Sequence, residues 1–212
     1  RPDKWLNIIK RGADWIINKR VSTQLDAPHA GLMPAGFSAE HLGPNDFYYW
    51  DDFWSVAGLH CASRMLAATD PELSQHYADA ARDFEQSIER SLATQADKLR
   101  RRAMPASPYR RLDSGAIGSV VCGYPLQLWA PDDPRTTDLV EFLLERCFLK
   151  GAFYQDMIHS GLNAYLTLHV AQVMMRADDP RYLDLIDAVA DIASATGQWP
   201  EAIHPLTGAG CM

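Results

Sequence analysis

Two acidic segments of the sequence could carry out acid–base chemistry. The stretch FYYWDDFW, residues 47–54, sets the adjacent carboxylates Asp51 and Asp52 among aromatic side chains. The stretch TGQWPEAIHPLTG, residues 196–208, holds Glu201 close to Trp199. Sugars pack their C–H faces on aromatic rings and donate hydroxyl hydrogen bonds to carboxylates, and cleavage of a glycosidic bond uses two carboxyl groups. The two segments together therefore favour a carbohydrate site.

We expect one acid to be protonated and the other to act as a base. An aromatic surround removes water from Asp51, which raises the pKa of its carboxyl group and keeps it protonated. The residues expected to contact a sugar share an acidic or aromatic character, or lie beside Glu201: Tyr49, Trp50, Asp52, Trp199 and His204.

Each of these residues also has an interpretation in which its role is only structural. Asp51 and Asp52 could be first-turn residues that a helix dipole favours, Glu201 an ordinary loop acid, and Trp50 and Trp199 core aromatics. Asp113 reads as a helix N-cap. His60 and His169 lie inside predicted helices and read as core histidines, whereas His159 and His204 lie in predicted loops and are better candidates for substrate contact.

The helical period dominates the chain, and we find no strand segment of any length. TDPEL, DDPRT and DDPRY each place an aspartate at a helix N-cap and a proline at the first helical position, which predicts helices that begin at Pro71, Pro134 and Pro180. Pro125 should kink a helix. The predicted helices cover about residues 2–20, 51–68, 71–95, 113–129, 134–149, 160–177 and 180–196.

Short and long connections alternate between these helices. The short ones are about 68–70, 130–133 and 178–179, and the long ones are about 21–49, 95–112, 150–159 and 197 onward. In antiparallel helices alternate connections lie on opposite ends, so all the long loops should gather on one face. Because long loops in a domain are usually functional, this face is where we expect the site.

Charge and cysteine content exclude several classes of function. A net charge of −7 and a pI of about 5.4 argue against binding to nucleic acid. The basic residues from Lys98 to Arg111 read as a solvated helix end and loop. Four scattered cysteines show no zinc spacing and suit a reducing, cytoplasmic setting, and no apolar run is long enough to span a membrane. We expect neither a metal nor a cofactor.

The hairpin array and its acids resemble the six-hairpin, (α/α)6 toroid glycosidases, and within them the glucoamylase-like enzymes. Trp50-Asp51-Asp52 is similar to the acidic pair after a Trp in that family, whose first acid is the general acid. Glu201 is similar to the family's general base. The resemblance implies that Asp51 protonates the leaving oxygen, that Glu201 activates water with inversion, and that Asp52 binds sugar. Asp51 stands where the family usually has a Glu.

This resemblance also implies a fold: all-α, with antiparallel helical hairpins that form part of an (α/α)6 toroid. Residues 1–212 would be a single domain covering about helices five to eleven, from a longer chain. The expected partner is a carbohydrate substrate, and an incomplete toroid could also associate through its exposed edge. Two other hypotheses remain. The chain could be a non-hydrolytic carbohydrate protein of phosphorylase, epimerase or lyase type, in which the basic loop serves as an anion pocket. It could also be a helical scaffold.

Overall fold

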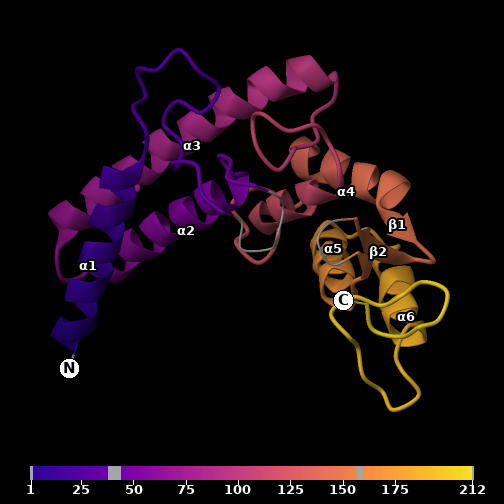
Figure 1. Ribbon diagram of the computed structural model, residues 1–212. Helices are drawn as coiled ribbons and strands as arrows, with labels where there is room; N and C mark the ends of the chain where they lie inside the picture. The colour runs from indigo at the N-terminus through magenta and orange to yellow at the C-terminus, as the bar shows by residue number, and fades with distance from the viewer. Residues whose placement is uncertain (1, 38–43, 157–159, 212) are drawn as a thin grey trace.

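The chain is an arch of helices. The computed structural model describes residues 2–37, 44–156 and 160–211, and Figure 1 shows the helices following one another around the arch from the N-terminal to the C-terminal end. The helices are α1 (Pro2–Lys19), α2 (Tyr49–Leu66), α3 (Pro71–Leu99), the 3₁₀ helix η1 (Ser114–Cys122), α4 (Pro134–Arg146), α5 (Ala164–Arg176) and α6 (Tyr182–Asp191). The predicted all-α class with helical hairpins is confirmed.

The hairpin of α2 and α3 has the cap that its sequence predicts. Asp70 is the N-cap of α3, where its carboxylate accepts a hydrogen bond from the Leu73 N–H at 3.2 Å, and Pro71 occupies the first turn. Lys10 of α1 forms an ion pair with Asp70 at 2.8 Å. These contacts fix α1 beside the turn between α2 and α3.

The expected α-helix over 113–129 is wrong. The segment forms η1, which ends at Cys122, and Pro125 follows the helix in a cis Tyr124–Pro125 peptide, so it kinks nothing. All nine residues of η1 are buried, and glycines and β-branched residues interrupt its sequence, SGAIGSVVC. Both features weaken an α-helix and leave no amphipathic face. The connection to α4 is therefore longer than predicted and covers 123–133.

The expectation of no strand is also wrong. A small antiparallel sheet in the order β1-β2-β3 consists of β1 (Phe148–Leu149), β2 (Ala152–Gln155) and β3 (Gly161–Leu162). Strands of two to four residues are too short to show an alternating pattern, which explains why the sequence does not reveal them. Because β3 occupies 161–162, α5 begins at Ala164, behind an Asn163 cap.

The two later aspartate–proline turns differ from each other. Asp133 caps α4 and Pro134 is its first residue, as predicted. By contrast, α6 begins at Tyr182 instead of Pro180. The Asp179 carboxylate accepts from the Arg181 N–H at 3.0 Å, and this local contact holds 179–181 in a turn.

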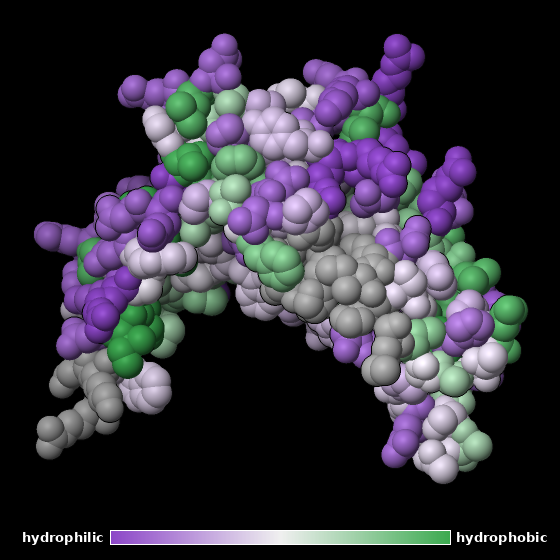
Figure 2. Space-filling view, viewed as in Figure 1, coloured by the Kyte–Doolittle hydropathy of each residue, from purple (hydrophilic) through white to green (hydrophobic). Residues whose placement is uncertain are grey.

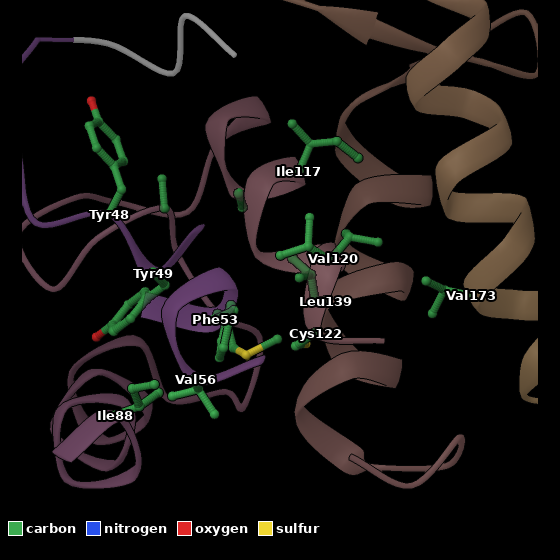
Figure 3. Close-up of a cluster of buried hydrophobic side chains, with 14 of the residues drawn as sticks. Tyr48, Tyr49, Phe53, Val56, Ile88, Ile117, Val120, Cys122, Leu139 and Val173 are labelled. Carbon is green, nitrogen blue, oxygen red and sulfur yellow. The ribbon is translucent and has the colours of Figure 1, made fainter. Parts of the chain in front are cut away.

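One hydrophobic core runs through the arch, with η1 at its centre. Figure 3 shows apolar side chains from α2, α3, η1, α4 and α5 facing one another, among them Phe53, Val56, Ile88, Ile117, Val120, Leu139 and Val173. A helix buried on all sides holds its neighbours in fixed positions. The core thereby sets where the loops on either side of η1 lie.

The long connections contact one another in chain order. The Tyr49 N–H, at the start of α2 and directly after segment 20–48, donates to Ala106 O of segment 100–113 at 3.0 Å. Ser114 Oγ donates to Asp156 O at 3.5 Å. Leu162 and Ile203 exchange backbone hydrogen bonds of 2.8 and 2.9 Å. These bonds join the borders of successive long connections, whereas the gathering of all long loops on one face stays a prediction, since the connection 123–133 is itself longer than the alternation expects.

Candidate functional site

Asp51 lies in the first turn of α2, where the series of long connections begins. Its backbone N–H donates to Tyr48 O at 3.0 Å, and its side chain is half-buried. A Cβ built on Gly36 would stand 3.9 Å from Asp51 Oδ2, so the entering loop passes close to the carboxylate. Burial raises the pKa of Asp51 above the usual value for an aspartate. Within the described ranges its carboxylate has no hydrogen-bond donor.

Charged groups surround the neighbouring Tyr48. Its hydroxyl donates to Pro44 O at 2.5 Å and accepts from Arg110 Nη1 at 3.4 Å. Burial raises the pKa of Tyr48, Arg110 opposes the rise, and three carboxylates add to it: Asp46, Asp51 and Asp113. These acids therefore lie within electrostatic reach of one hydroxyl group. Asp113 also caps η1 through the Gly115 N–H at 3.0 Å, as its sequence context predicts.

Two long connections together build an aromatic wall. His29 stacks on Phe47 with ring centroids 4.0 Å apart, and the Tyr109 ring lies within 6 Å of both. The Tyr109 hydroxyl also forms a hydrogen bond with His29 Nδ1. His29, Tyr109 and Asp46 are not among the residues that the sequence predicts for this site. Irregular loops carry no periodicity, so nothing in the sequence indicates that 20–48 and 100–113 meet there.

Asp52 and Tyr49, both predicted sugar contacts, point into the protein. Asp52 is 1% exposed, and its Oδ1 accepts from the Met33 N–H at 2.8 Å. Its Oδ2 has no hydrogen-bond partner within the described part of the chain, and burial raises its pKa well above the usual value. Tyr49 is fully buried and its hydroxyl bonds Ser91 Oγ at 2.7 Å. Both side chains fix α2 against its neighbours, so their roles as ligand contacts stay predictions.

Trp50 is half-buried and stands one helical turn from Trp54, with ring centroids 5.8 Å apart. It keeps part of its surface open for contact with a ligand.

The segment with Glu201 lies at the far end of the arch, after α6. Glu201 is exposed, but the next two residues, Ala202 and Ile203, are buried, and Ile203 pairs with β3. Trp199 Nε1 donates to Val189 O at 2.7 Å while its ring stays half-exposed. No described contact joins Glu201 to Asp51, which lies in the first turn of α2, and Figure 1 shows α2 and α6 in different parts of the arch. Their pairing stays a prediction.

His204 closes the turn after Glu201. Its Nδ1 accepts from the N–H groups of Leu206 and Thr207, at 3.2 and 3.3 Å, and the side chain is exposed. Among the described residues, none forms a hydrogen bond with the other ring nitrogen, Nε2. His204 could therefore offer Nε2 to a ligand while Nδ1 shapes the loop.

The remaining candidate groups have structural partners. His169 is buried against Tyr124 O and burial lowers its pKa, and His60 bonds Glu85 at 2.8 Å. Arg101, from the proposed anion pocket, is instead paired with Asp138 at 2.6 Å. His159 lies outside the described residues.

Two negative findings apply to the described part of the chain. No group of three His, Cys, Asp or Glu side chains there could hold a metal ion. No helix there is both long and apolar enough to cross a membrane.

The fold and this loop face define a class: an all-α protein of helical hairpins with acids and aromatic rings on its long connections. The structure is similar to a solved structure of a glycosidase variant, with a TM-score of 0.56 and 14% identity over 83% of this chain. The likeness shows a glycosidase-like fold. This chain spans about half of that one, 48% of its length. No family model matches the sequence, and no curated protein matches it.

Proposed function

We propose that this chain carries a catalytic face of a glycoside hydrolase and that Asp51 is its general acid. The observation that supports this most directly is the state of Asp51: a half-buried carboxyl group with a raised pKa, in an aromatic-rich segment at the start of α2, within a glycosidase-like fold. A raised pKa keeps this carboxyl group protonated to a higher pH than an ordinary aspartate, and the protonated form can donate a proton to a glycosidic oxygen.

Glu201 is the proposed partner that activates water. It is exposed and sits on a segment that Ile203 anchors to the sheet, so it combines access to water with a fixed backbone. If water attacks directly, the reaction inverts the anomeric centre and the two carboxyl groups stand roughly 6.5–9.5 Å apart. This pairing belongs to the proposed partial (α/α)6 toroid, in which the long loops meet around one substrate.

Carbohydrate binding would use the partly open rings on this face. Trp50 and Trp199 both keep exposed surface against which a sugar ring can pack. Asp52 and Tyr49 would act mainly by holding Asp51 in place, because α2 carries all three. The substrate class we propose is a glucoside or an oligosaccharide.

The experiment measures reducing sugar released from a panel of α-glucosides and oligosaccharides, with and without phosphate. We expect Asp51→Asn and Glu201→Gln each to lower kcat by about 10²–10⁴-fold. The matched controls are Asp187→Asn and Glu145→Gln, because both side chains are exposed and lie outside the site. Equal rates in Asp51→Asn and Asp187→Asn would refute the acid role, and release that needs phosphate would show a phosphorylase.

A further inference from the structure

An open apolar groove runs between α1 and α2, and each of its lining residues belongs to one of these two helices. It has a volume of about 470 Å³. Trp5, Ile8 and Trp15 recur on α1 at intervals of three and seven residues, and so share one helix face. Figure 2 shows hydrophobic side chains over α1 at the lower left. The lining residues are Ile9, Gly12, Ala13, Trp15, Ile16, Trp54, Ser55, Gly58, Cys61, Ala62 and Met65.

The groove has a shape that accepts a helix. Its floor contains Gly12, where an added Cβ would meet nothing within 4 Å, and Gly58, where it would meet only the end of Ile16 at 3.4 Å. Its rims carry large apolar side chains, Trp15, Trp54 and Met65, which are 55%, 41% and 55% exposed. A floor of small residues between bulky rims lets a second helix approach closely.

The exposed area is large enough for a stable contact between two chains. A tryptophan buries at most about 250 Å², so the open parts of Trp5, Trp15 and Trp54 add to roughly 400 Å². Ile8 and Met65, both about half-exposed, bring the total to roughly 600 Å² on each copy. Two such faces bury about 1,200 Å², the lower bound of specific interfaces, and one face already matches the largest patches found on monomers.

We propose that a second copy of this chain occupies the groove, with α1 of each copy lying in the groove of the other. The chain itself supplies the helix that fits, because the face with Trp5, Ile8 and Trp15 is an apolar ridge beside the groove. A ridge and a groove on the same surface allow a two-fold contact in which each copy uses the same residues. This inference stands independently of the proposed catalytic function.

Cys61 provides a direct readout of this contact. It is an exposed free cysteine in the groove, whereas Cys211 is half-exposed and lies in the C-terminal segment, and Cys122 and Cys147 are buried. A second copy should cover Cys61 and leave Cys211 unchanged.

The experiment combines sedimentation velocity with alkylation by iodoacetamide over about 1–100 µM protein, a range that spans micromolar dissociation constants. The expected result is a rise to twice 23.7 kDa with concentration and at least a tenfold slower alkylation of Cys61, relative to Cys211, in the dimer. Peptide mapping by mass spectrometry assigns each modified cysteine.

Trp15→Glu and Met65→Glu should each stay monomeric and keep Cys61 reactive, with far-UV circular dichroism unchanged. The control is Leu206→Glu, since Leu206 is 83% exposed in the C-terminal loop, and it should dimerise like the original chain. Wild-type protein that stays monomeric over the whole concentration range would overturn the proposal. The groove would then be a site for a helix of another kind. Association that Leu206→Glu disrupts as strongly as Trp15→Glu would also overturn it.

Discussion

Asp51 and Asp52 are neighbours in sequence with opposite surroundings. Asp51 is half-buried on the loop face, whereas Asp52 is 1% exposed and points into the core beneath segment 20–37. Successive residues of a helix point about 100° apart, which suffices to separate them. The sequence shows that an acidic pair lies among aromatics, but only packing decides which acid stays accessible.

If Asp51 is the proposed general acid, its protonation should govern the alkaline limb of activity. A general acid works in its protonated form, so kcat falls as pH rises through its pKa, and the burial of Asp51 moves this limb above the range of an ordinary aspartate. Profiles of kcat against pH for the wild type and Asp51→Glu should both show the limb, and the residual activity of Asp51→Asn should lack it. An unchanged limb in Asp51→Asn would assign it to another group.

Asp52→Asn should stabilise the protein at neutral pH. Burial raises the pKa of Asp52, so the folded state binds its proton more tightly than the unfolded state does. Stability is then lost as pH rises from the ordinary aspartate pKa through the raised value. Asparagine is always neutral, and its Oδ1 can still accept from the Met33 N–H.

Thermal unfolding between pH 4 and pH 8 tests this expectation. The gain of Asp52→Asn over the wild type should grow with pH, and each kcal/mol corresponds to about 2–4 °C in Tm. A variant less stable than the wild type at pH 8 would show that the buried charge is compensated.

At the scale of elements, the sequence predicts most helices because their signals are local. Aspartate caps and first-turn prolines mark the starts of α3 and α4, since a cap depends on only a few neighbouring residues. The start of α6 is two residues late because Asp179 bonds within its own turn. The small sheet and η1 are not predicted, because strand pairing and burial determine them and both arise only in the folded chain.

Asp138 anchors the loop that carries Tyr109 and Arg110. Its carboxylate accepts from Arg101 at 2.6 and 3.2 Å and from the Ala103 N–H at 2.6 Å. Burial alone would raise the pKa of Asp138, but these donors hold it below the usual value. Asp138→Asn should therefore cost about 1–3 kcal/mol of stability at pH 7.

Urea unfolding measures this cost, with Asp187→Asn as the neutral control. Because the folded pKa of Asp138 is lowered, its contribution is present above the ordinary aspartate pKa and is lost as pH falls through the folded value. The difference between wild type and Asp138→Asn should shrink in acid. A difference that persists at low pH would point to packing instead of charge.

Gly161 permits the contact that holds the Glu201 segment. A Cβ at this position would lie 2.9 Å from the Ile203 backbone nitrogen and 3.0 Å from Ala202 Cβ. Gly161→Ala must therefore push this segment away from β3, with an expected cost of about 1–3 kcal/mol.

If Glu201 acts in catalysis, the displacement in Gly161→Ala should also lower kcat while leaving α2 and Asp51 intact. Gly208→Ala is a comparison in the same segment: its Cβ meets nothing within 4 Å, although its φ of +70° adds local strain. Turnover in Gly161→Ala equal to that of the wild type would argue against a role for Glu201.

At the scale of the molecule, η1, α4 and α5 pack so closely in the core that little space remains between them. A Cβ on Gly123 would lie 3.0 Å from Thr136 Cγ2 and 3.1 Å from Val173 Cγ1, between η1, α4 and α5. Gly123→Ala should lower the free energy of unfolding by about 1–3 kcal/mol. We expect one cooperative transition by circular dichroism and by tryptophan fluorescence, and separate transitions would show that the two halves of the arch unfold independently.

The sequence predicts only part of the candidate site. The alternation of loop lengths predicts that the long connections share a face, and this stays a prediction; the structure shows that Tyr49 of α2 bonds Ala106 and that Leu162 of β3 bonds Ile203. Which loop residues meet is a different matter, since His29 and Tyr109 come together from segments 80 residues apart. Such contacts depend on the helices that carry the loops and not on any local pattern.

The order of contacts around the arch has a consequence for synthesis. The elements that pack together are mostly close in sequence: α1 with α2, α2 with α3, η1 with α4, and α5 with α6. Each helix can dock on a neighbour that the ribosome has already released, so the chain can fold progressively from its N-terminal end. Contacts of this local kind are formed quickly, and the core side of each hairpin should be exposed to solvent only until the next hairpin emerges.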